Sequence, residues 1–244
     1  MNKLVGRLFQ LNTMSILPST FRALIIGSSG AIGSALVTSL QNNPSCSMVV
    51  GIHRQSNPSI DYADMQTIES AANRLSGEAP FQLIINTIGM LHSILGMPEK
   101  RLADLNPEQL HLLLQTNTIG PAITIQHFSK LLDPNGSVMA TISAKVGSIS
   151  DNRLGGWYSY RASKAALNMV IKTAAIEFAR TKPNTAIVSL HPGTVNSNLS
   201  RPFRGEQIGR SPQEAANDLL QIIYTLSPED SGSFISYSGE RLPW

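Results

Sequence analysis

Tyr160 and Lys164 lie four residues apart in the run from Tyr158 to Lys164, which predicts a helix. At that spacing two helical side chains share one face. A phenol normally titrates at about pH 10, so it is a poor base at neutral pH unless a nearby cation favours the phenolate. Lys164 is such a cation, and the pair can therefore do proton chemistry. The alternative is an ordinary amphipathic helix face, and the remaining motifs decide between the two.

Length, charge and cysteine content limit the classes of protein. The chain has 244 residues, 42% of them hydrophobic, which suits one α/β domain with a sizeable core. A formal net charge of +3 argues against a nucleic-acid partner. The single Cys46 excludes an intramolecular disulfide and a cysteine-cluster metal site, which fits the reducing cytoplasm. No run approaches the roughly 20 apolar residues that span a bilayer, so we expect no membrane partner.

The N-terminal quarter of the chain is positively biased, because no Asp or Glu precedes Asp61. Such a bias can serve an anionic ligand. Residues 1–20 hold Lys3 and Arg7 and match neither a signal peptide with a cleavage site nor a core strand. Three interpretations stay open: a flexible extension, which we favour; a later start at Met14; or an organelle-targeting segment.

The domain, expected over residues 21–244, alternates short apolar runs with longer helical periods. Strands that are apolar on both faces and separated by helices are typical of a parallel sheet covered on both sides. We therefore expect a single doubly wound, Rossmann-type α/β domain without internal repeats. The expected strands are 22–26, 48–52, 81–85, 137–142, 185–190 and 233–237. The expected helices are 34–41, 107–132, 159–179 and 212–225.

The turn after the first expected strand contains Gly27, Gly30 and Gly33 and leads directly into a helix. Glycine permits the tight turn, the close approach of backbone to a pyrophosphate and the packing of helix on sheet. Amides at the helix N-terminus then bind the phosphates. This position predicts dinucleotide binding, and a loop that needs glycine only to turn the chain is the alternative.

The end of the second expected strand indicates which dinucleotide binds. An acidic residue there usually bonds the ribose 2′-hydroxyl of NAD, whereas a basic residue accommodates the 2′-phosphate of NADP. The strand ends at Ile52, and His53 and Arg54 follow it without an acid. Arg54 can pair with a phosphate as a planar fork, and His53 can add a donor. NADP(H) is therefore favoured over NAD(H), and a solvated loop cation is the alternative for Arg54.

Taken in order, these motifs and several others resemble the short-chain dehydrogenase/reductase family from about residue 23 to residue 244. The further marks are Asn86-Thr87-Ile88-Gly89, Asn117, Ser143 and Pro192-Gly193. Within the family, the run 155–158 and the C-terminal residues 242–244 resemble the C-factor-like group, whose members were linked to cell-to-cell signalling. The resemblance implies an NADP(H)-dependent oxidoreductase that acts on a carbonyl/alcohol pair, usually as a homodimer or homotetramer.

The resemblance also implies catalytic roles. Tyr160 would donate a proton to the substrate carbonyl oxygen in a reduction and take it back in an oxidation. Lys164 would lower the pKa of Tyr160 and bond the nicotinamide ribose, and Ser143 would stabilise charge on the carbonyl oxygen. Asn117 would position a water behind Lys164. Two structural alternatives stay open: Ser143 capping a strand end, and Asn117 bonding backbone at a helix irregularity.

Cofactor contacts are implied in the loops that follow the strands. Asp61, after a presumed third strand, either contacts the adenine or caps the next helix. Val195 would meet the nicotinamide carboxamide through its backbone. We expect no metal site. The complete set of expected cofactor residues is Gly27, Ser29, Gly30, Ile32, Gly33, His53, Arg54, Asp61, Asn86, Ile88, Gly89, Tyr160, Lys164, Pro192, Gly193, Val195 and Ser197.

The segment 196–210 contains proline and glycine residues and predicts a mobile lid over the substrate. Arg201 and Arg204 within it contact either an acidic substrate or solvent, and solvent is favoured. His191 is expected to pack within its loop rather than to approach the cofactor. A function from a different class stays open as well, namely a dinucleotide-binding signalling protein with little turnover.

Overall fold

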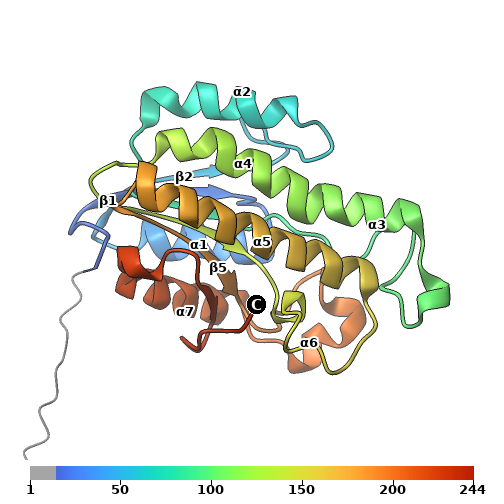
Figure 1. The fold of residues 1–244 in the computed structure, drawn as a ribbon. Helices are drawn as coiled ribbons and strands as arrows, with labels where there is room; N and C mark the ends of the chain where they lie inside the picture. Colours follow the sequence, from blue (N-terminus) through green and yellow to red (C-terminus); the bar gives the residue numbers. More distant parts are fainter. Residues whose placement is uncertain (1–14) are drawn as a thin grey trace, which may run out of the picture.

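Six apolar segments form a parallel sheet in the computed structural model, which describes residues 15–244. The strands are β1 Phe21–Ile26, β2 Cys46–Ile52, β3 Leu83–Asn86, β4 Ser137–Ile142, β5 Thr185–His191 and β6 Phe234–Ser236. Their order across the sheet is β2-β1-β3-β4-β5-β6, and all neighbouring pairs are parallel. The chain therefore starts in the interior of the sheet, builds one edge and then crosses to build the other (Figure 1). This is the doubly wound arrangement that the sequence predicts.

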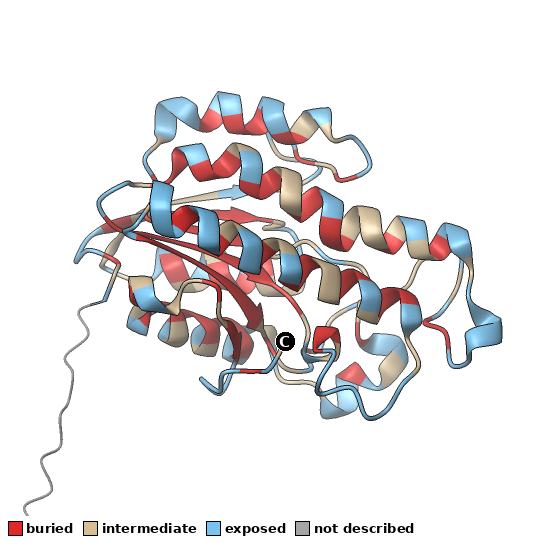
Figure 2. Ribbon diagram, in the orientation of Figure 1, coloured by how far each residue is buried: buried red, intermediate tan, exposed pale blue. Residues whose placement is uncertain are grey.

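Helices cover both faces of the sheet. They are α1 Ala31–Gln41, α2 Gln66–Leu75, α3 Pro107–Leu114, α4 Gly120–Phe128, α5 Tyr158–Thr181, α6 Gly205–Ile208 and α7 Pro212–Thr225. Successive strand residues point to opposite faces. Ala23 and Ile25 of β1 therefore join the core cluster of α1 and α7, whereas Leu24 and Ile26 join that of α2, α4 and α5. In Figure 2 the strands are mostly buried and the helices expose only their outer faces.

The helix expected over residues 107–132 is interrupted, because a π-helical turn spans Gln115–Ile119 between α3 and α4. Pro121 follows this turn, and proline has no N–H that could donate to the Asn117 carbonyl as an α-helix requires. The π turn is the local adjustment that accommodates the missing bond. The prediction of one continuous helix is therefore wrong here, and Asn117 lies in the irregular turn.

The third strand presumed before Asp61 is absent from the described part of the chain. After β2 the chain turns back, and the N–H groups of Ser56 and Ile60 both donate to the His53 carbonyl, at 3.2 and 3.1 Å. These bonds close a loop where a further strand would have paired with β2. Consequently β2 is an edge strand, and the strand that ends at Asn86 directly follows β2 along the chain.

Most of the extension expected over residues 1–20, including the alternative start at Met14, lies outside the described residues. From residue 15 onward the chain is packed: the Ile16 N–H donates to the Leu226 carbonyl at 2.9 Å, and Leu17 is buried in the cluster of α1 and α7. The packed domain thus begins before the boundary expected at residue 21. No helix within residues 15–244 is both long and apolar enough to cross a membrane.

Gly33 tests how closely α1 packs on the turn after β1. A Cβ at Gly33 would lie 2.2 Å from the Gly27 carbonyl oxygen, so the turn must open to accept a methyl group. We expect Gly33→Ala to lower the free energy of unfolding by about 1–3 kcal/mol, as overpacked sites do. A Cβ at Gly77 would meet no atom within 4 Å, so Gly77→Ala is the matched control. Denaturant titration measures both variants, and equal midpoints would contradict the described packing.

Candidate active site

A cavity of about 790 Å³ lies at the carboxyl ends of β3, β4 and β5, the edge at which parallel α/β sheets bind their ligands. The loop after each of these strands contributes to its wall, together with residues of α5. Expected site residues that line it are Ile32, Ile88, Gly89, Ser143, Tyr160, Lys164, Pro192, Gly193, Val195 and Ser197. Expected residues outside its lining are Gly27, Ser29, Gly30, Gly33, His53, Arg54, Asp61, Asn86 and Asn117.

Tyr160 and Lys164 lie one turn apart near the start of α5, and both are buried, with exposed fractions of 8% and 3%. The Lys164 Nζ lies 5.9 Å from the centroid of the Tyr160 ring. It donates a hydrogen bond of 3.1 Å to the carbonyl of Ile142, the last residue of β4. The structure therefore brings the phenol and the ammonium group together in the wall of the cavity.

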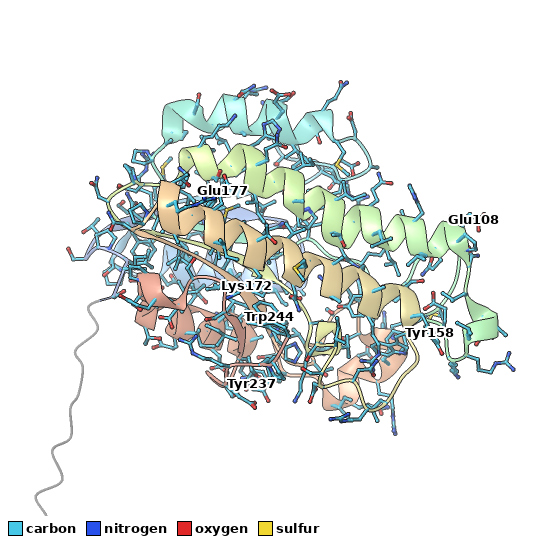
Figure 3. All side chains as sticks on the ribbon, in the orientation of Figure 1. Glu108, Tyr158, Lys172, Glu177, Tyr237 and Trp244 are labelled. Atoms are coloured by element: carbon cyan, nitrogen blue, oxygen red, sulfur yellow. The ribbon has the colours of Figure 1, made fainter. Side chains whose placement is uncertain are left out.

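Glu99 holds the start of α5. The N-cap of this helix, Trp157, has a φ of +55°, in the left-handed region. The buried Glu99 carboxylate accepts hydrogen bonds from the Ser159 N–H, at 3.1 Å, and from the Ser159 hydroxyl. A carboxylate at this position satisfies free amides and is favoured by the helix dipole. The loop that carries Glu99 thus fixes the start of α5, close to Tyr160. In Figure 3 the label of Tyr158 marks this end of the helix.

Burial controls the protonation of the pair. It raises the pKa of Tyr160 above the ordinary value for a phenol and lowers the pKa of Lys164 to about 8. In both groups the charged form loses its contact with water. Desolvation of the phenolate is the cause of the raised Tyr160 pKa, and the lowering contribution expected from Lys164 stays a prediction. Tyr160 keeps its proton at neutral pH.

Ser143 directly follows β4 and is buried, with 2% of its surface exposed. Its N–H donates to the Leu190 carbonyl at 2.8 Å and so continues the pairing of β4 with β5. Its hydroxyl donates to the Oδ1 of Asn168, on α5, at 2.7 Å. The hydroxyl therefore bonds a helix side chain beside the cavity and does not cap the end of its own strand.

Asn117 is completely buried in the π turn. Its Oδ1 accepts the Met90 N–H at 2.8 Å, and its Nδ2 donates to the Met90 carbonyl at 2.7 Å and to the Ser163 Oγ at 3.0 Å. A Cβ at Gly89 would lie 3.4 Å from the Lys164 Nζ and 3.5 Å from the Asn117 Oδ1, so the amide and the ammonium group flank the same glycine. The side chain of Asn117 thus bonds backbone, as the structural alternative states, within reach of the site.

Backbone groups shape the turn after β1. Gly27 has a φ of +86°, and a Cβ there would lie 2.7 Å from the Thr87 hydroxyl oxygen. The N-cap of α1, Gly30, provides no side-chain acceptor, and the first turn of α1 contains no acidic residue. The first amides of α1 are thus without side-chain partners, as an anion-binding helix N-terminus requires. The residues of this turn fit the phosphates of a dinucleotide.

The end of β2 lies against this turn. The N–H groups of Gly27 and Ser28 donate to the Ile52 carbonyl at 2.8 and 3.1 Å, and His53 and Arg54 follow immediately. Arg54 is exposed and forms no ion pair with any other residue of the described chain. A free guanidinium group therefore stands beside the glycine turn, at the position predicted to select the dinucleotide.

Asp61 and Asn86 use their side chains within the scaffold. The Asp61 Oδ1 accepts the N–H two residues later, at 3.0 Å, whereas the Asp64 Oδ1 accepts that of Gln66, the first residue of α2, at 3.1 Å. The helix-capping alternative for Asp61 is therefore wrong. Asn86 is 1% exposed and donates to the Tyr62 hydroxyl at 2.8 Å. Its side chain holds the loop after β3 to the neighbouring turn.

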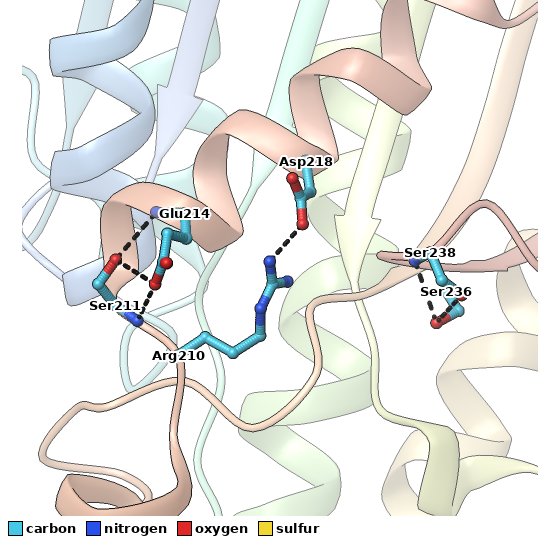
Figure 4. Close-up of polar contacts among 6 residues, drawn as sticks. All are labelled: Arg210, Ser211, Glu214, Asp218, Ser236 and Ser238. Carbon is cyan, nitrogen blue, oxygen red and sulfur yellow. Dashed lines mark hydrogen bonds and ion pairs between the residues drawn. The ribbon is translucent and has the colours of Figure 1, made fainter.

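The segment 196–210, expected as a lid, is anchored at both ends. Backbone hydrogen bonds of 2.9 Å join Arg210 to the residues at the start of the segment. The Arg210 side chain forms an ion pair with Asp218 of α7, and a capping box between Ser211 and Glu214 begins that helix (Figure 4). The two ends of the segment are thereby joined to each other and, through Arg210, to α7.

Between these anchors the segment supplies apolar wall. Leu199 and Phe203 line the cavity, and the Phe203 ring centroid lies 4.9 Å from that of Trp157. Arg201 and Arg204 are exposed and do not line the cavity, as the solvent interpretation expects. The segment therefore lines the cavity with apolar side chains and turns the side chains of Arg201 and Arg204 outward.

Glu99, Asn168 and His191 take part in the site or its support, and the sequence pattern marks them poorly. Nothing near Glu99 marks a capping carboxylate, since its partners are 60 residues away. Asn168 stands one turn after Lys164, and this spacing could have revealed it. His191, expected to pack in its loop, packs against Tyr237 but also lines the cavity. Burial lowers the pKa of His191 to about 4, so it is neutral at pH 7.

The sequence is similar to a known family model and to several characterised proteins. A family model described as enoyl-(acyl carrier protein) reductase matches residues 37–232. The 1-hydroxy-2-glutathionyl-2-methyl-3-butene dehydrogenase of Rhodococcus sp. (strain AD45) is 32% identical over 189 residues, which cover 77% of this chain and 79% of that protein. The C-signal protein of Myxococcus xanthus is 34% identical over 107 residues, 43% of this chain and 60% of that protein.

Solved structures share the fold. The carbonyl reductase Sniffer of D. melanogaster superposes with a TM-score of 0.79 at 23% identity, covering 92% of this chain and 100% of that one. A carbonyl reductase from Pseudomonas aeruginosa PAO1 gives a TM-score of 0.74 at 25% identity, with coverage of 92% and 100%. With the family model and the Rhodococcus relative, these matches show that the chain belongs to the short-chain dehydrogenase/reductase family of oxidoreductases.

Proposed function

We propose that this enzyme is an NADP(H)-dependent carbonyl reductase in which Tyr160 exchanges a proton with the substrate oxygen. One observation carries the proposal: a buried, protonated phenol lies beside a buried ammonium group and a serine hydroxyl in the wall of one cavity. Each of these three side chains loses hydration, and proton transfer to a carbonyl oxygen uses all three. A protein that only recognises a dinucleotide can use Lys164 as a contact but does not need all three groups together as a proton-transfer site.

The cofactor would be held by the turn after β1 and the end of β2. The dinucleotide, when bound, supplies the hydride in a reduction and accepts it in an oxidation. The amides at the start of α1 suit its pyrophosphate, and Arg54, assisted by His53, suits a 2′-phosphate. Structures of similar fold include an NADPH-bound carbonyl reductase from chicken fatty liver and a Burkholderia multivorans protein with bound NADP, each 23% identical. These support the choice of cofactor.

The nicotinamide end would be held by the loops after β3 and β5. Ile88 and Gly89 line the cavity from one loop and Val195 and Ser197 from the other. The remaining cofactor contacts are still predictions, and they are Gly27, Ser29, Gly30, Ile32, Gly33, Asp61, Asn86, Pro192 and Gly193. For Asp61 we keep the contact with the adenine, because its side chain does not cap α2. Asn86 would act indirectly, by holding the loop after β3 in place.

Tyr160 acts as the proton donor in the reductive direction. Because burial raises its pKa, the hydroxyl carries its proton throughout the neutral range. The carbonyl carbon gains the hydride, the carbonyl oxygen gains the Tyr160 proton, and the product is an alcohol. The phenolate left behind is stabilised by the Lys164 ammonium group, whose pKa of about 8 keeps it charged at pH 7. Reprotonation of Tyr160 from solvent completes the cycle, with Asn117 positioning the relay behind Lys164.

Ser143 and the apolar walls would orient the substrate. The Ser143 hydroxyl donates to the carbonyl oxygen and stabilises the charge that develops on it. Leu199, Phe203 and Trp157 present apolar surface around the same cavity. We infer an apolar aldehyde, ketone or quinone as substrate, covered by residues 196–210 acting as a lid.

A signalling or regulatory role is the second candidate, and the similarity to the C-signal protein of Myxococcus xanthus favours it. The chain spans 60% of that protein's length.

For assembly we infer a homodimer or homotetramer through α4 and α5. The outer surface of α5 carries Met169 and Ile176, which are 67% and 60% exposed, and Ile119, which is 45% exposed, ends the π turn directly before α4. Such apolar side chains suit a face buried by a second copy.

Replacing the phenol tests the proton donor. Tyr160→Phe should lower kcat at least about 100-fold, because general acid catalysis contributes that much, while the Kd of NADPH changes less than twofold. Stopped-flow absorbance and fluorescence titration measure the two quantities. Tyr158→Phe alters the exposed neighbouring tyrosine and is the control. Undiminished activity in Tyr160→Phe would remove the catalytic assignment.

Arg54 tests the cofactor preference. Arg54→Ala should raise the Kd of NADPH about tenfold or more, since a hydrogen bond to a charged group contributes roughly 1.5–3 kcal/mol, and should leave the Kd of NADH unchanged. Arg180→Ala, at the far end of α5, removes an equal charge away from the site. Tighter binding of NADH than of NADPH by the native protein would refute the role of Arg54.

The burial of Lys164 predicts a pH dependence of stability without cofactor. Between pH 8 and pH 10 the unfolded chain holds the Lys164 proton more firmly than the folded protein, because the folded pKa is about 8. The free energy of unfolding should therefore rise by about 1.5 kcal/mol from pH 8 to pH 9.5. Lys164→Met should abolish this rise, whereas Lys172→Met, on the exposed side of α5, should keep it. Denaturant titrations at several pH values measure the free energy of unfolding. The same dependence of this free energy on pH in both variants would contradict the burial of Lys164.

A further inference from the structure

A buried polar cluster lies behind Ser143, between the sheet and α5. The Oδ1 of Asn168, a residue 3% exposed, accepts the Ser143 hydroxyl at 2.7 Å and the Ser189 hydroxyl at 3.1 Å. Thr141 is the partner of Ser189 in the register of β4 and β5. Thr141 and Ser143 are two residues apart and point to the same face of the sheet. Three hydroxyl groups and one carboxamide are thus enclosed on the face that α5 covers.

Two atoms of this cluster lack a hydrogen-bond partner among the described residues, the Nδ2 of Asn168 and the Oγ1 of Thr141. Buried amide and hydroxyl groups are nearly always paired, because an orphaned one costs about 1–3 kcal/mol. Ser143 has a single hydroxyl hydrogen, and it is directed at Asn168. In this arrangement Ser143 can accept a hydrogen bond from the cavity but cannot donate one.

The carboxamide of Asn168 can reverse that direction. Its oxygen and its amino group have nearly the same shape, so a half-turn of the carboxamide exchanges acceptor for donor in the same space. The Nδ2 then donates to the Ser143 and Ser189 oxygens, and the orphaned donor gains partners. The Ser143 hydrogen is released and can point into the cavity.

We propose that Asn168 is a positioning residue that sets the direction of the Ser143 O–H and aims it at the substrate oxygen. The inference rests on the proposed carbonyl reduction and deepens it. Asn168 does not line the cavity, so its influence passes through Ser143. An arriving carbonyl oxygen only accepts hydrogen bonds and therefore favours the turned carboxamide. Ser143 becomes a donor when a substrate needs one.

Asn168→Asp tests this with a side chain of the same shape. An ionised carboxyl group can only accept, so it holds the Ser143 hydrogen away from the substrate, whereas a protonated one can donate. We expect kcat for a carbonyl substrate to fall about 100-fold at pH 9, the lower end of the effect of losing one oxyanion donor, while the Kd of NADPH stays within twofold. Activity should recover as the pH falls toward 5, an acidic limb that the native enzyme lacks.

The pH profile separates positioning from simple damage. The titratable groups of the adjoining cavity wall include Tyr160 and Lys164 on α5, His191 at the end of β5, and Lys145 and Asp151 after β4. The native protein and the variant share them, so they cannot create the new limb. Asn184→Asp makes the same chemical change at an exposed site and should leave both kcat and the pH profile unchanged.

A double-mutant cycle supplies the second measurement. In a Ser143→Ala background, Asn168→Asp should have little further effect, because both changes remove the same donor. If Asn168→Asp does not fold, Asn168→Ala serves in the same cycle, with a loss of about tenfold expected only when Ser143 is present. Native kcat in the Asn168 variants, or losses that add to that of Ser143→Ala, would overturn the inference. Native protein that reduces no carbonyl compound would instead overturn the proposed function, and this inference with it.

Discussion

The buried ammonium group of Lys164 is the constraint on which the rest of the site depends. A charge with 3% exposure has lost most of its hydration, and its hydrogen-bond acceptor in the protein is the Ile142 carbonyl at the end of β4. This bond joins α5 to the end of β4 and so helps to fix the position of Tyr160, which lies one helical turn before Lys164. Glu99 holds the start of the same helix, and Asn168 ties it to Ser143. Three contacts from different parts of the chain thus hold Tyr160 and Ser143 at the cavity where the proposed proton transfer would take place.

The two ends of the proposed cofactor region use different kinds of chemical group. At the phosphate end the groups are backbone amides and an exposed guanidinium group, and close packing of Gly27 and Gly33 shapes the turn. At the nicotinamide end they are buried side chains whose ionisation depends on the surrounding protein. The phosphate end therefore depends on backbone geometry and the reacting end on desolvation. The neutral His191 and the apolar side chains of residues 196–210 line the adjoining part of the cavity, where the proposed substrate would also be desolvated.

Much of the fold could be predicted from the sequence because the strands are apolar on both faces. The run 137–142 matches β4 and the run 212–225 matches α7 without a shift. The presumed strand before Asp61 was wrong, since that loop closes on its own backbone through bonds that no hydrophobic pattern reveals. The break at Gln115–Ile119 depends on the missing N–H of Pro121, a signal that was present in the sequence but overridden by the helical period.

The candidate site was less predictable than the fold. Tyr160 and Lys164 could be predicted from their spacing and Ser143 from the family resemblance, and the structure places all three in one cavity wall. The direction of the Tyr160 pKa could not be predicted, because desolvation depends on residues distant in sequence that cover the ring. The roles of Glu99 and Asn168 could not be predicted for the same reason, since each bonds a partner that only the tertiary structure brings near.

The most direct test of the account is turnover by the purified protein with NADPH and a panel of aldehydes, ketones and quinones, followed by absorbance of the reduced nicotinamide and by identification of the product. The account predicts oxidation of NADPH with at least one carbonyl class and one equivalent of alcohol formed per NADPH consumed. NADPH that binds tightly but is not oxidised by any member of the panel would contradict it and favour the signalling role.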